Sequence, residues 1–415
     1  MVGLRALAFL GVSILSLVSA YPTTISDIES NHTHDADRYI VTLRTGLEYS
    51  AVEQHMRQAA SLHARSHSPM VEMGRRWSIG AWNAYSCTMD TETLAEISTD
   101  DAVELVEPDS PISIMKHVTQ VNAPWNLGAI SHRMSNHIDY VYDSRGGEGT
   151  YAYILDTGIL ATHDEFEGRA QLGYNALDTP FVDDVGHGTH VAGTIAGKTY
   201  GVAKKAKIIS IKILGRRVSY TSDFLEGYTW AVSNITLNER EEKSVISISA
   251  GGAARESINM AIDEAYKNGI LTVVSAGNSN ADAKNFSPAS AQNAITVGSV
   301  GPNYARSTFS NFGELVDIFA PGEYVQSAFI HNDHDTKMAA GTSMATPHIS
   351  GLILYLKSIL PYRMKTPVDS VKELQQLATD GIILNVKGSK NLFGFNGNGV
   401  VIPTHSPQDL CDEDS

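Results

Sequence analysis

The sequence predicts an α/β protein with a doubly wound, mainly parallel sheet, preceded by a small α+β domain. Beyond Asn122, short apolar runs alternate with stretches that have the period of an amphipathic helix. Apolar runs without polar alternation predict strands buried on both faces, which is typical of a parallel sheet covered by helices. Before Asn122, strands and helices alternate within a much shorter stretch, which indicates a separate domain.

The larger domain is expected to begin at residue 118 and to end at residue 402. In parallel sheets of this kind, binding sites form at the carboxyl ends of the strands. The expected strands are Tyr151–Leu155, Ile208–Leu214, Val245–Ser249, Leu271–Ser275, Ala294–Val297 and Leu315–Phe319, and the expected helices include Phe224–Val232, Glu256–Asn268 and Thr346–Leu360.

The small domain is expected to fill residues 21–117. Its first residues are polar, and His32 and His34 among them are interpreted as part of a leader rather than a metal tract. A further strand is predicted near Val71–Trp77. The other expected elements are the strands Tyr39–Leu43, Ala81–Met89 and Val103–Pro108 and the helices Leu47–Arg65 and Thr91–Ser98.

The N-terminus reads as a secretory signal peptide over residues 1–20. Arg5 precedes the apolar run Ala6–Leu17, and Val18-Ser-Ala20 forms a small-residue cleavage site. No other segment reaches ~18 apolar residues, so we expect a secreted chain without a membrane span. Secretion makes three Asn-x-Ser/Thr acceptors candidates for glycosylation, with the third least favoured because Pro288 follows it: Asn31, Asn234 and Asn285.

Composition excludes some function classes. The formal charge of −15 argues against nucleic-acid binding. The two cysteines, Cys87 and Cys411, lie in the small domain and in an acidic, flexible tail over residues 403–415. We interpret both thiols as incidental, although a disulfide from the tail to a partner is an alternative.

Three glycine-bearing motifs carry an acid, an imidazole and a hydroxyl. Asp156 follows an expected strand in Asp-Thr-Gly, His187 lies in Gly-His-Gly-Thr-His-Val-Ala-Gly, and Ser343 lies in Gly-Thr-Ser-Met-Ala at the head of a helix. Acyl transfer needs these three groups: a hydroxyl nucleophile, a base for its proton, and an acid that orients the base. Asn278 ends another expected strand, where its amide can donate to an oxyanion.

Neighbouring residues offer alternatives to these assignments. His190 is interpreted as a packing residue, because a His-x-x-His zinc site lacks the glutamate that zinc hydrolases place beside it. Asp164, Asp183 and Asp184 lie in polar stretches and are expected to be solvated carboxylates. An α/β-hydrolase esterase would need Gly-x-Ser-x-Gly and the order Ser, Asp, His, so that class fails. An inactive binding relative is disfavoured because all four residues are present.

The order Asp, His, Ser is that of subtilisin, and the chain resembles subtilisin-like serine proteases of the proteinase-K-like secreted fungal group. The resemblance runs from residue 39 to about residue 400. It rests on the three motifs above and on Thr162–Arg169, Tyr200–Lys205, Ala276–Asn278, Asn285–Ser290 and Phe309–Gly313.

The resemblance implies a secreted serine endopeptidase, made as an autoprocessed zymogen and acting as a monomer on protein and peptide substrates. It implies the triad Asp156, His187 and Ser343, with Asn278 and the Ser343 N–H as oxyanion donors. The small domain would be a ferredoxin-like propeptide that inhibits the enzyme and is cleaved near Lys116–His117. The implied substrate-binding residues are Ser249, Ala250, Gly251, Ser219 and Tyr220.

No cofactor is implied for the chemistry, but the resemblance implies a structural calcium ion held by Asp317 and by carbonyls of Gln292 and Ala294. The His331–Asp335 segment is interpreted as an exposed loop. Two departures from the family stand out. Arg216 and Arg217 replace small residues in the second substrate segment. We expect them to face solvent, and the alternative is that they change the family's preference for apolar side chains at the outer subsites. Val191 stands where relatives often carry a cysteine, which predicts resistance to thiol reagents.

Overall fold

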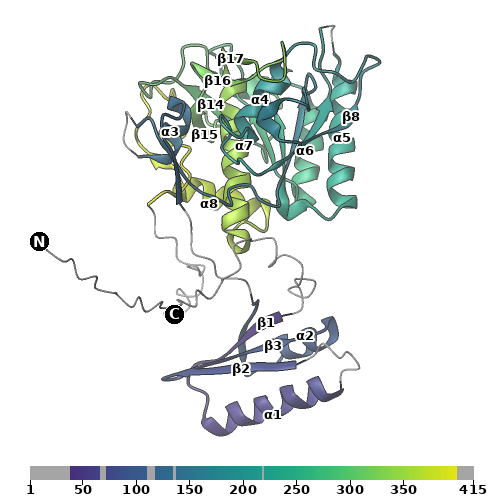
Figure 1. Ribbon diagram of the computed structural model, residues 1–415, viewed down its shortest axis with the longest axis vertical. Helices are drawn as coiled ribbons and strands as arrows, with labels where there is room; N and C mark the ends of the chain where they lie inside the picture. The colour runs from purple at the N-terminus through teal and green to yellow at the C-terminus, as the bar shows by residue number, and fades with distance from the viewer. Residues whose placement is uncertain (1–37, 66–71, 110–116, 134–136, 217–218, 400–415) are drawn as a thin grey trace, which may run out of the picture. The chain divides into compact units, whose positions relative to one another are not determined.

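The computed structural model describes residues 38–65, 72–109, 117–133, 137–216 and 219–399 (Figure 1). The chain divides into two compact units, Met1–Ile114 and Met115–Ser415. The predicted signal peptide, the acidic tail, Asn31, Cys411 and Arg217 lie outside the described residues.

The smaller unit is an α+β domain with a four-stranded antiparallel sheet in the order β2-β3-β1-β4. All six predicted elements are present, including the strand expected near Val71–Trp77. Their bounds are β1 Arg38–Leu43, α1 Tyr49–Arg65, β2 Glu72–Ile79, β3 Trp82–Thr88, α2 Thr91–Ser98 and β4 Val103–Pro108. The helices and the sheet enclose one apolar core, whose members include Val41, Met56, Tyr85 and Ile97.

The larger unit contains a nine-stranded sheet in the order β18-β19-β15-β14-β12-β10-β7-β9-β8. Every neighbouring pair is parallel except β18 and β19. The strands are β7 Tyr151–Asp156, β8 Ala170–Asn175, β9 Lys207–Lys212, β10 Ser244–Ile248, β12 Thr272–Ser275, β14 Ile295–Val300, β15 Ile318–Pro321, β18 Thr379–Asp380 and β19 Leu392–Phe393.

Helices cover both faces of this sheet, which confirms the doubly wound fold (Figure 1). Along β7, Ala152 and Ile154 join the core that includes α4 and α7, whereas Tyr153 and Leu155 join the core that includes α5 and α6. The helices are α3 Trp125–Ser131, α4 His187–Ala196, α5 Thr221–Leu237, α6 Glu256–Lys267, α7 Thr342–Ile359 and α8 Pro367–Leu377. Three short strand pairs complete the unit: β5 His117–Gln120 with β6 Tyr140–Asp143, β11 Gly252–Ala253 with β13 Phe286–Ser287, and β16 Val325–Ala328 with β17 Thr336–Ala339.

The structure adds elements that the sequence pattern did not predict. β8 is an edge strand whose residues are half-buried or exposed, so it lacks an apolar run. α3 has only seven residues, too few to display a helical period. α7 begins at Thr342 rather than at the expected Thr346, which places Ser343 inside the first turn of the helix.

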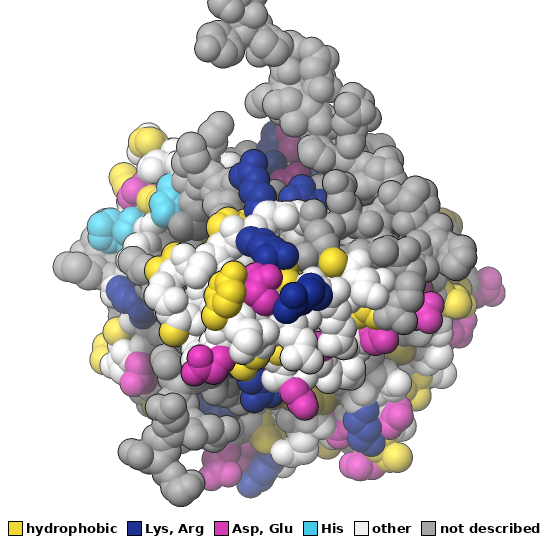
Figure 2. All heavy atoms as spheres, turned by 90° about the horizontal axis from the view of Figure 1, so that it is seen from below, with side chains coloured by type: hydrophobic (Ala, Val, Ile, Leu, Met, Phe, Trp, Pro, Cys, Tyr) yellow, Lys and Arg dark blue, Asp and Glu magenta, His cyan; other side chains and the backbone are white. Residues whose placement is uncertain are grey.

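The surface carries charges of both signs. On the face in Figure 2, Lys and Arg side chains lie close to Asp and Glu side chains. Arg76 pairs with Glu53 at 3.6 Å, and Lys205 pairs with Glu148 at 3.2 Å. Such exposed pairs contribute little to stability, so each unit is stabilised mainly by its own buried apolar residues.

Candidate active site

Asp156 and His187 form a hydrogen-bonded pair at the carboxyl edge of the sheet. Asp156 is the last residue of β7, and its side chain is 1% exposed. His187 begins α4, and its Nδ1 lies 2.7 Å from Asp156 Oδ1. The same carboxylate oxygen accepts the Thr157 N–H at 2.7 Å. The carboxyl group is therefore held against one imidazole nitrogen, which leaves the other for proton transfer.

Close packing of α4 against the Asp156 turn depends on the glycine that follows His187. A Cβ built on Gly188 would lie 2.1 Å from the Gly158 carbonyl oxygen and 3.1 Å from Asp156 Cβ. The glycine of this motif is thus required for the approach that brings the imidazole to the acid.

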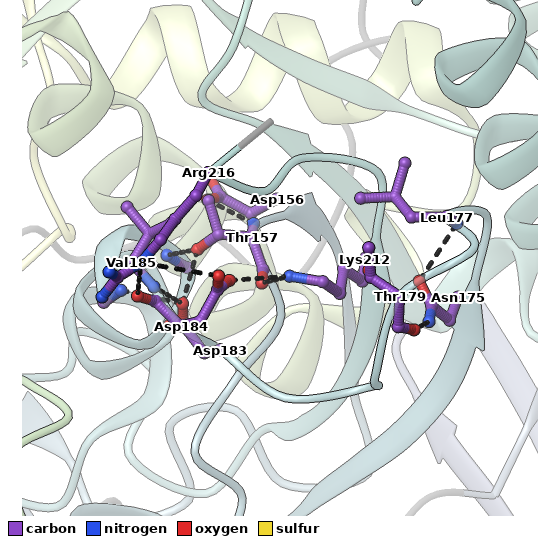
Figure 3. A network of polar contacts seen from close by, with 12 residues as sticks. Asp156, Thr157, Asn175, Leu177, Thr179, Asp183, Asp184, Val185, Lys212 and Arg216 are labelled. Atoms are coloured by element: carbon purple, nitrogen blue, oxygen red, sulfur yellow. Dashed lines mark hydrogen bonds and ion pairs between the residues drawn. The ribbon is translucent and has the colours of Figure 1, made fainter. Parts of the chain in front are cut away.

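A polar network supports the turn after β7 (Figure 3). The buried Lys212 Nζ donates to the Thr157 carbonyl oxygen at 2.7 Å and lies 3.2 Å from Asp184 Oδ1. The Thr157 hydroxyl accepts from the Gly188 N–H at 2.9 Å and donates to Asp183 Oδ1 at 2.8 Å. Thr157 therefore links the strand that carries the acid to the helix that carries the imidazole.

The expectation that Asp183 is a solvated carboxylate was wrong. Besides the Thr157 bond, its oxygens accept from the N–H groups of Val185 at 3.1 Å, Gly186 at 2.8 Å and Thr189 at 3.0 Å, and from the Thr189 hydroxyl at 2.6 Å. Asp183 organises the start of α4, a role that polar surroundings in sequence do not reveal.

Asp164 and Asp184 are closer to what was expected. The Asp164 side chain is 51% exposed and pairs with His334, and that of Asp184 is 40% exposed. Asp184 meets two cationic side chains, Lys212 at 3.2 Å and Arg216 Nε at 3.6 Å.

The pKa of His187 is raised. Burial of the ring lowers it, but the charge of Asp156, the hydrogen bond to that carboxylate and the charge of Asp183 raise it by more. The protonated imidazole is thus stabilised by its surroundings, as a base that must accept a proton requires.

His190 lies on the same helix but has a different environment. Its Nε2 lies 3.1 Å from the Val325 carbonyl oxygen and 3.0 Å from that of Lys337, and the residue is 1% exposed. Burial lowers its pKa to about 4. The structure confirms the interpretation of His190 as a packing and hydrogen-bonding residue.

Ser343 lies in the first turn of α7, and its hydroxyl points to a main-chain acceptor. Its Oγ donates to the Ser249 carbonyl oxygen at 3.0 Å and, among the described residues, makes no hydrogen bond to His187. Gly341, with φ 152°, caps the helix and allows the chain to turn into it. His187 and Ser343 nevertheless line one cleft, whose volume is about 600 Å³.

The orientation of the Asn278 amide is set by Thr342. Its Oδ1 accepts from the Thr342 N–H at 2.8 Å and from the Thr342 hydroxyl at 3.0 Å. Because the oxygen is engaged with α7, the Nδ2 hydrogens remain available to a ligand. Asn278 lines the same cleft as Ser343.

All five residues expected to bind substrate line this cleft: Ser219, Tyr220, Ser249, Ala250 and Gly251. The sequence interpretation missed several others, including Leu214, Ser275, Phe286 and Pro288. Leu214 and Ser275 were signalled by their position at the carboxyl end of an expected strand, and Phe286 and Pro288 by their place in the motif Asn285–Ser290. Arg216 does not line the cleft, and its side chain is 76% exposed, so it faces solvent as expected.

The residues around Asp317 do not fit a calcium ion. Asp317 Oδ2 accepts the Thr296 N–H at 3.0 Å, and Oδ1 lies 2.7 Å from Lys390 Nζ. Calcium takes about six to eight oxygen ligands, whereas here an ammonium group already meets the carboxylate. Gln292 and Ala294 lie on the segment before β14, which leads to Thr296.

A parallel sheet with an acid–imidazole pair and a hydroxyl facing one cleft at its carboxyl edge defines a class of hydrolase that uses an activated serine. A model of the subtilase family, Peptidase S8, matches residues 147–396. A model of the peptidase inhibitor I9 family matches residues 38–115. The chain belongs to the subtilase family and is a serine endopeptidase with an I9-type inhibitory propeptide.

Relatives of known activity cover nearly the whole chain. Alkaline protease 1 of Aspergillus flavus is 44% identical over 87% of this chain and 91% of its own length. Subtilisin-like proteinase Mp1 of Magnaporthiopsis poae is 45% identical over 96% of this chain and 99% of its own length. The crystal structure of a cold adapted subtilisin-like serine proteinase is similar at 36% identity, with a TM-score of 0.61 over 66% of this chain and 98% of that chain. Among the described residues, no helix is long and apolar enough to cross a membrane.

Proposed function

We propose that this endopeptidase cleaves peptide bonds through an acyl-enzyme formed on Ser343, with His187 as general base and Asp156 as its orienting acid. The observation that carries the proposal is the 2.7 Å contact between His187 Nδ1 and Asp156 Oδ1 beside the cleft that Ser343 lines. A bound peptide carbonyl draws the Ser343 hydroxyl from Ser249 toward His187, which takes its proton as the tetrahedral intermediate forms.

Two donors stabilise the negative charge of that intermediate in this mechanism. One is Asn278 Nδ2, whose amide is oriented by Thr342. The other is the Ser343 N–H, which lies in the first turn of α7, where backbone N–H groups have no partner within the helix. Both the acylation and the deacylation step use them, because each passes through an oxyanion.

The substrate binds in extended form along the cleft in this proposal. Ser249, Ala250 and Gly251 follow β10 and offer main-chain groups to a peptide strand, as in strand addition. Ser219 and Tyr220 form the opposite wall, and Tyr220 is 70% exposed, so it is free to cover a bound side chain. Position 251 has no room for a side chain, because a Cβ on Gly251 would lie 2.8 Å from the Ser287 carbonyl oxygen and 3.3 Å from Pro288 Cδ.

The chain is made as a zymogen that processes itself and acts as a secreted monomer. The match of residues 38–115 to an inhibitor family supports an inhibitory propeptide. Cleavage near Lys116–His117 would release β5 as the first strand of the mature enzyme. The signal-peptide pattern of residues 1–20 supports secretion.

Secretion leaves the three Asn-x-Ser/Thr acceptors as candidates for glycans. Asn234 lies within α5 and its Oδ1 accepts from the Tyr153 hydroxyl at 2.8 Å. Asn285 is exposed, whereas Asn234 is half-buried. Exposure supports Asn285 over Asn234 as the modified position.

Lys390 takes the place of a structural calcium ion at Asp317. The 2.7 Å contact between Lys390 Nζ and Asp317 Oδ1 supports this. The segment of Gln292 and Ala294 then needs no metal to hold it near β15.

The test compares the secreted wild type with Ser343→Ala, using peptidase activity and N-terminal sequencing of both products. We expect the wild type to cleave peptides and to begin near residue 117, and the variant to stay unprocessed and inactive. Comparable activity in a contaminant-free variant would show that Ser343 is not the nucleophile. Processing of the variant in a purified preparation would show that maturation is not autocatalytic.

A further inference from the structure

His132, His137 and Asp139 converge between the end of α3 and the start of β6, outside the catalytic cleft. The two imidazole rings are stacked, with centroids 3.9 Å apart and planes 4° from parallel. His132 Nε2 lies 3.8 Å from Asp139 Oδ2, and His137 Nδ1 lies 3.9 Å from Asp139 Oδ1. Each carboxylate oxygen thus faces one imidazole nitrogen.

These three groups approach one another without forming hydrogen bonds. Their possible ligand atoms all lie within 4.8 Å of one another, yet both His–Asp separations exceed hydrogen-bond distance. A different pair in the same unit shows the contrast, because His331 Nδ1 lies only 2.6 Å from Asp335 Oδ2. The wider separation leaves room for an ion between the donors.

The tautomer of His132 suits metal binding. Its Nδ1 lies 3.1 Å from both the Gly128 carbonyl oxygen and the Ser131 hydroxyl, and because the carbonyl oxygen can only accept, the tautomer that satisfies it carries the hydrogen on Nδ1. In the neutral ring, that bond leaves the lone pair on Nε2, the atom that faces Asp139. A backbone acceptor on the far nitrogen is the usual support of a metal-ligating histidine.

The surrounding chain holds the three residues in place. A Cβ on Gly128 would lie 2.2 Å from the His137 carbonyl oxygen, so this glycine lets the His137 backbone lie against α3. The next residue after His132, Arg133, donates to the carbonyl oxygens of Leu377 and Ala378 at 2.9 Å and 3.2 Å. The His132 side chain is only 16% exposed. The cluster therefore has two half-buried ligands, His132 and Asp139, and one exposed ligand, His137.

We propose that His132 Nε2, His137 Nδ1 and Asp139 bind a zinc ion. Two imidazole nitrogens and one carboxylate oxygen form a donor set that suits zinc, with the fourth tetrahedral position left to water. Tetrahedral zinc at bond lengths of about 2.0–2.1 Å separates its ligands by about 3.3 Å. A ligating imidazole nitrogen bonds a metal in the plane of its ring, so the exposed His137 ring must turn out of its stack on His132 before both nitrogens reach one ion.

The bound ion links α3 to β6 and leaves the peptidase chemistry untouched. β6 pairs with β5 from His117↔Asp143 to Gln120↔Tyr140, so the link also secures the strand at the proposed start of the mature enzyme. Zinc that binds only the folded state stabilises that state, so the unfolding temperature rises with the logarithm of the zinc concentration.

The experiment uses the mature enzyme, inactivated with a sulfonyl fluoride to prevent autolysis and freed of metal by dialysis. Zinc chloride is titrated by calorimetry, and the unfolding temperature is measured with and without zinc. Cobalt chloride provides an independent readout, because tetrahedral cobalt with nitrogen ligands absorbs strongly in the visible range. The variants are His137→Ala and Asp139→Asn, with His334→Ala as the matched control at an exposed histidine outside the site.

We expect one zinc per chain with micromolar or tighter affinity, a rise of several degrees in unfolding temperature, and a tetrahedral cobalt spectrum. His137→Ala and Asp139→Asn should each weaken binding by at least about 100-fold, while His334→Ala should bind as the wild type does. Absence of stoichiometric binding to the wild type, or equal affinity in His137→Ala, would overturn the proposal. Loss of binding in His334→Ala alone would place the ion at the other loop and overturn it as well.

Discussion

The first turns of α4 and α7 carry the two reactive side chains, and they differ in how completely the free enzyme holds them. Both helices begin after a glycine, Gly186 or Gly341. His187 in α4 is already bonded to a buried carboxylate at 2.7 Å. Ser343 in α7 is bonded to a main-chain carbonyl and not to the base. The base is assembled before substrate arrives, whereas the nucleophile needs the substrate to complete its contact.

The two helices also share a buried histidine further along. His190 in α4 and His348 in α7 both bond to main-chain carbonyl oxygens, His348 through Nδ1 to Met344 at 2.8 Å. Burial lowers the pKa of each to about 4. Position along the helix therefore decides whether an imidazole is a base or a neutral packing group.

The largest effect is expected from Asp156→Asn, which removes the charge that prepares the base. A triad with this change keeps its geometry but loses about 10⁴-fold in kcat, because the imidazole adopts the wrong tautomer. His187 must be neutral to accept a proton, so activity falls as pH drops through its pKa. Asp156 raises that pKa, so the acidic limb of the variant's kcat profile should lie at lower pH.

The measurement uses the catalytic domain co-expressed with the propeptide as a separate chain, so that no self-cleavage is needed. The prediction is wrong if the acidic limb stays at the same pH and kcat falls by less than about tenfold. Asp156 would then not act on His187, and the base would not be prepared in the free enzyme.

A smaller loss is expected from Asn278→Ala on the α7 side of the comparison. Removal of the side-chain oxyanion donor of subtilisin costs about 10²–10³-fold in kcat, and we expect the same order here with little change in KM. Asn278→Asp, which has the same shape but offers a negative oxygen, is the matched control and should be at least as poor. A change confined to KM would show that Asn278 binds substrate rather than the oxyanion.

Acid should destabilise the larger unit through His190 and His348. The unfolded chain takes up protons below pH 6.5, but the folded chain leaves both rings neutral until about pH 4. The free energy of unfolding therefore falls as pH drops from 6.5 to 4, by about 3 kcal/mol for each ring at the lower end.

We would measure the unfolding temperature of sulfonyl-inhibited enzyme between pH 7.5 and 4.5. His348→Gln should lower stability at neutral pH, because its bond to Asn126 at 2.8 Å is disturbed, but should show a shallower fall in acid. His334→Gln, at an exposed histidine, serves as the control. If the unfolding temperatures of the wild type and His348→Gln fall in parallel as pH drops, protonation of His348 is not a cause of the acid destabilisation.

The smallest effect is expected at Asp317. This carboxylate pairs with Lys390, whereas the carboxylate of Asp156 pairs with the imidazole of His187. Lys390 is 48% exposed, so its pair with Asp317 is worth at most about 1 kcal/mol. Millimolar calcium should hardly change the unfolding temperature of the wild type, but should raise that of Lys390→Met by a few degrees. The double variant Lys390→Met with Asp317→Asn should lose that gain. A clear calcium response of the wild type that Asp317→Asn abolishes would show that the ion displaces Lys390.

The sequence alone determined the fold class and the reactive groups. Apolar runs set the buried strands, and the glycine-bearing motifs placed Asp156, His187 and Ser343 at strand and helix ends, where parallel sheets gather their sites. Gly188 illustrates why this works, since a local requirement for close packing leaves a visible residue in the chain. The smaller unit was also predictable, because its strands and helices alternate with clear periodicity.

Only the tertiary structure decided how those groups and their neighbours are used. Asp183 and Asp184 are adjacent in sequence, yet one binds the start of α4 and the other meets Lys212, which comes from β9. Lys390 reaches Asp317 from 73 residues away, and Thr342 orients Asn278 from 64 residues away. These contacts depend on the order of strands in the sheet, and no local pattern encodes which distant side chain will meet a given charge.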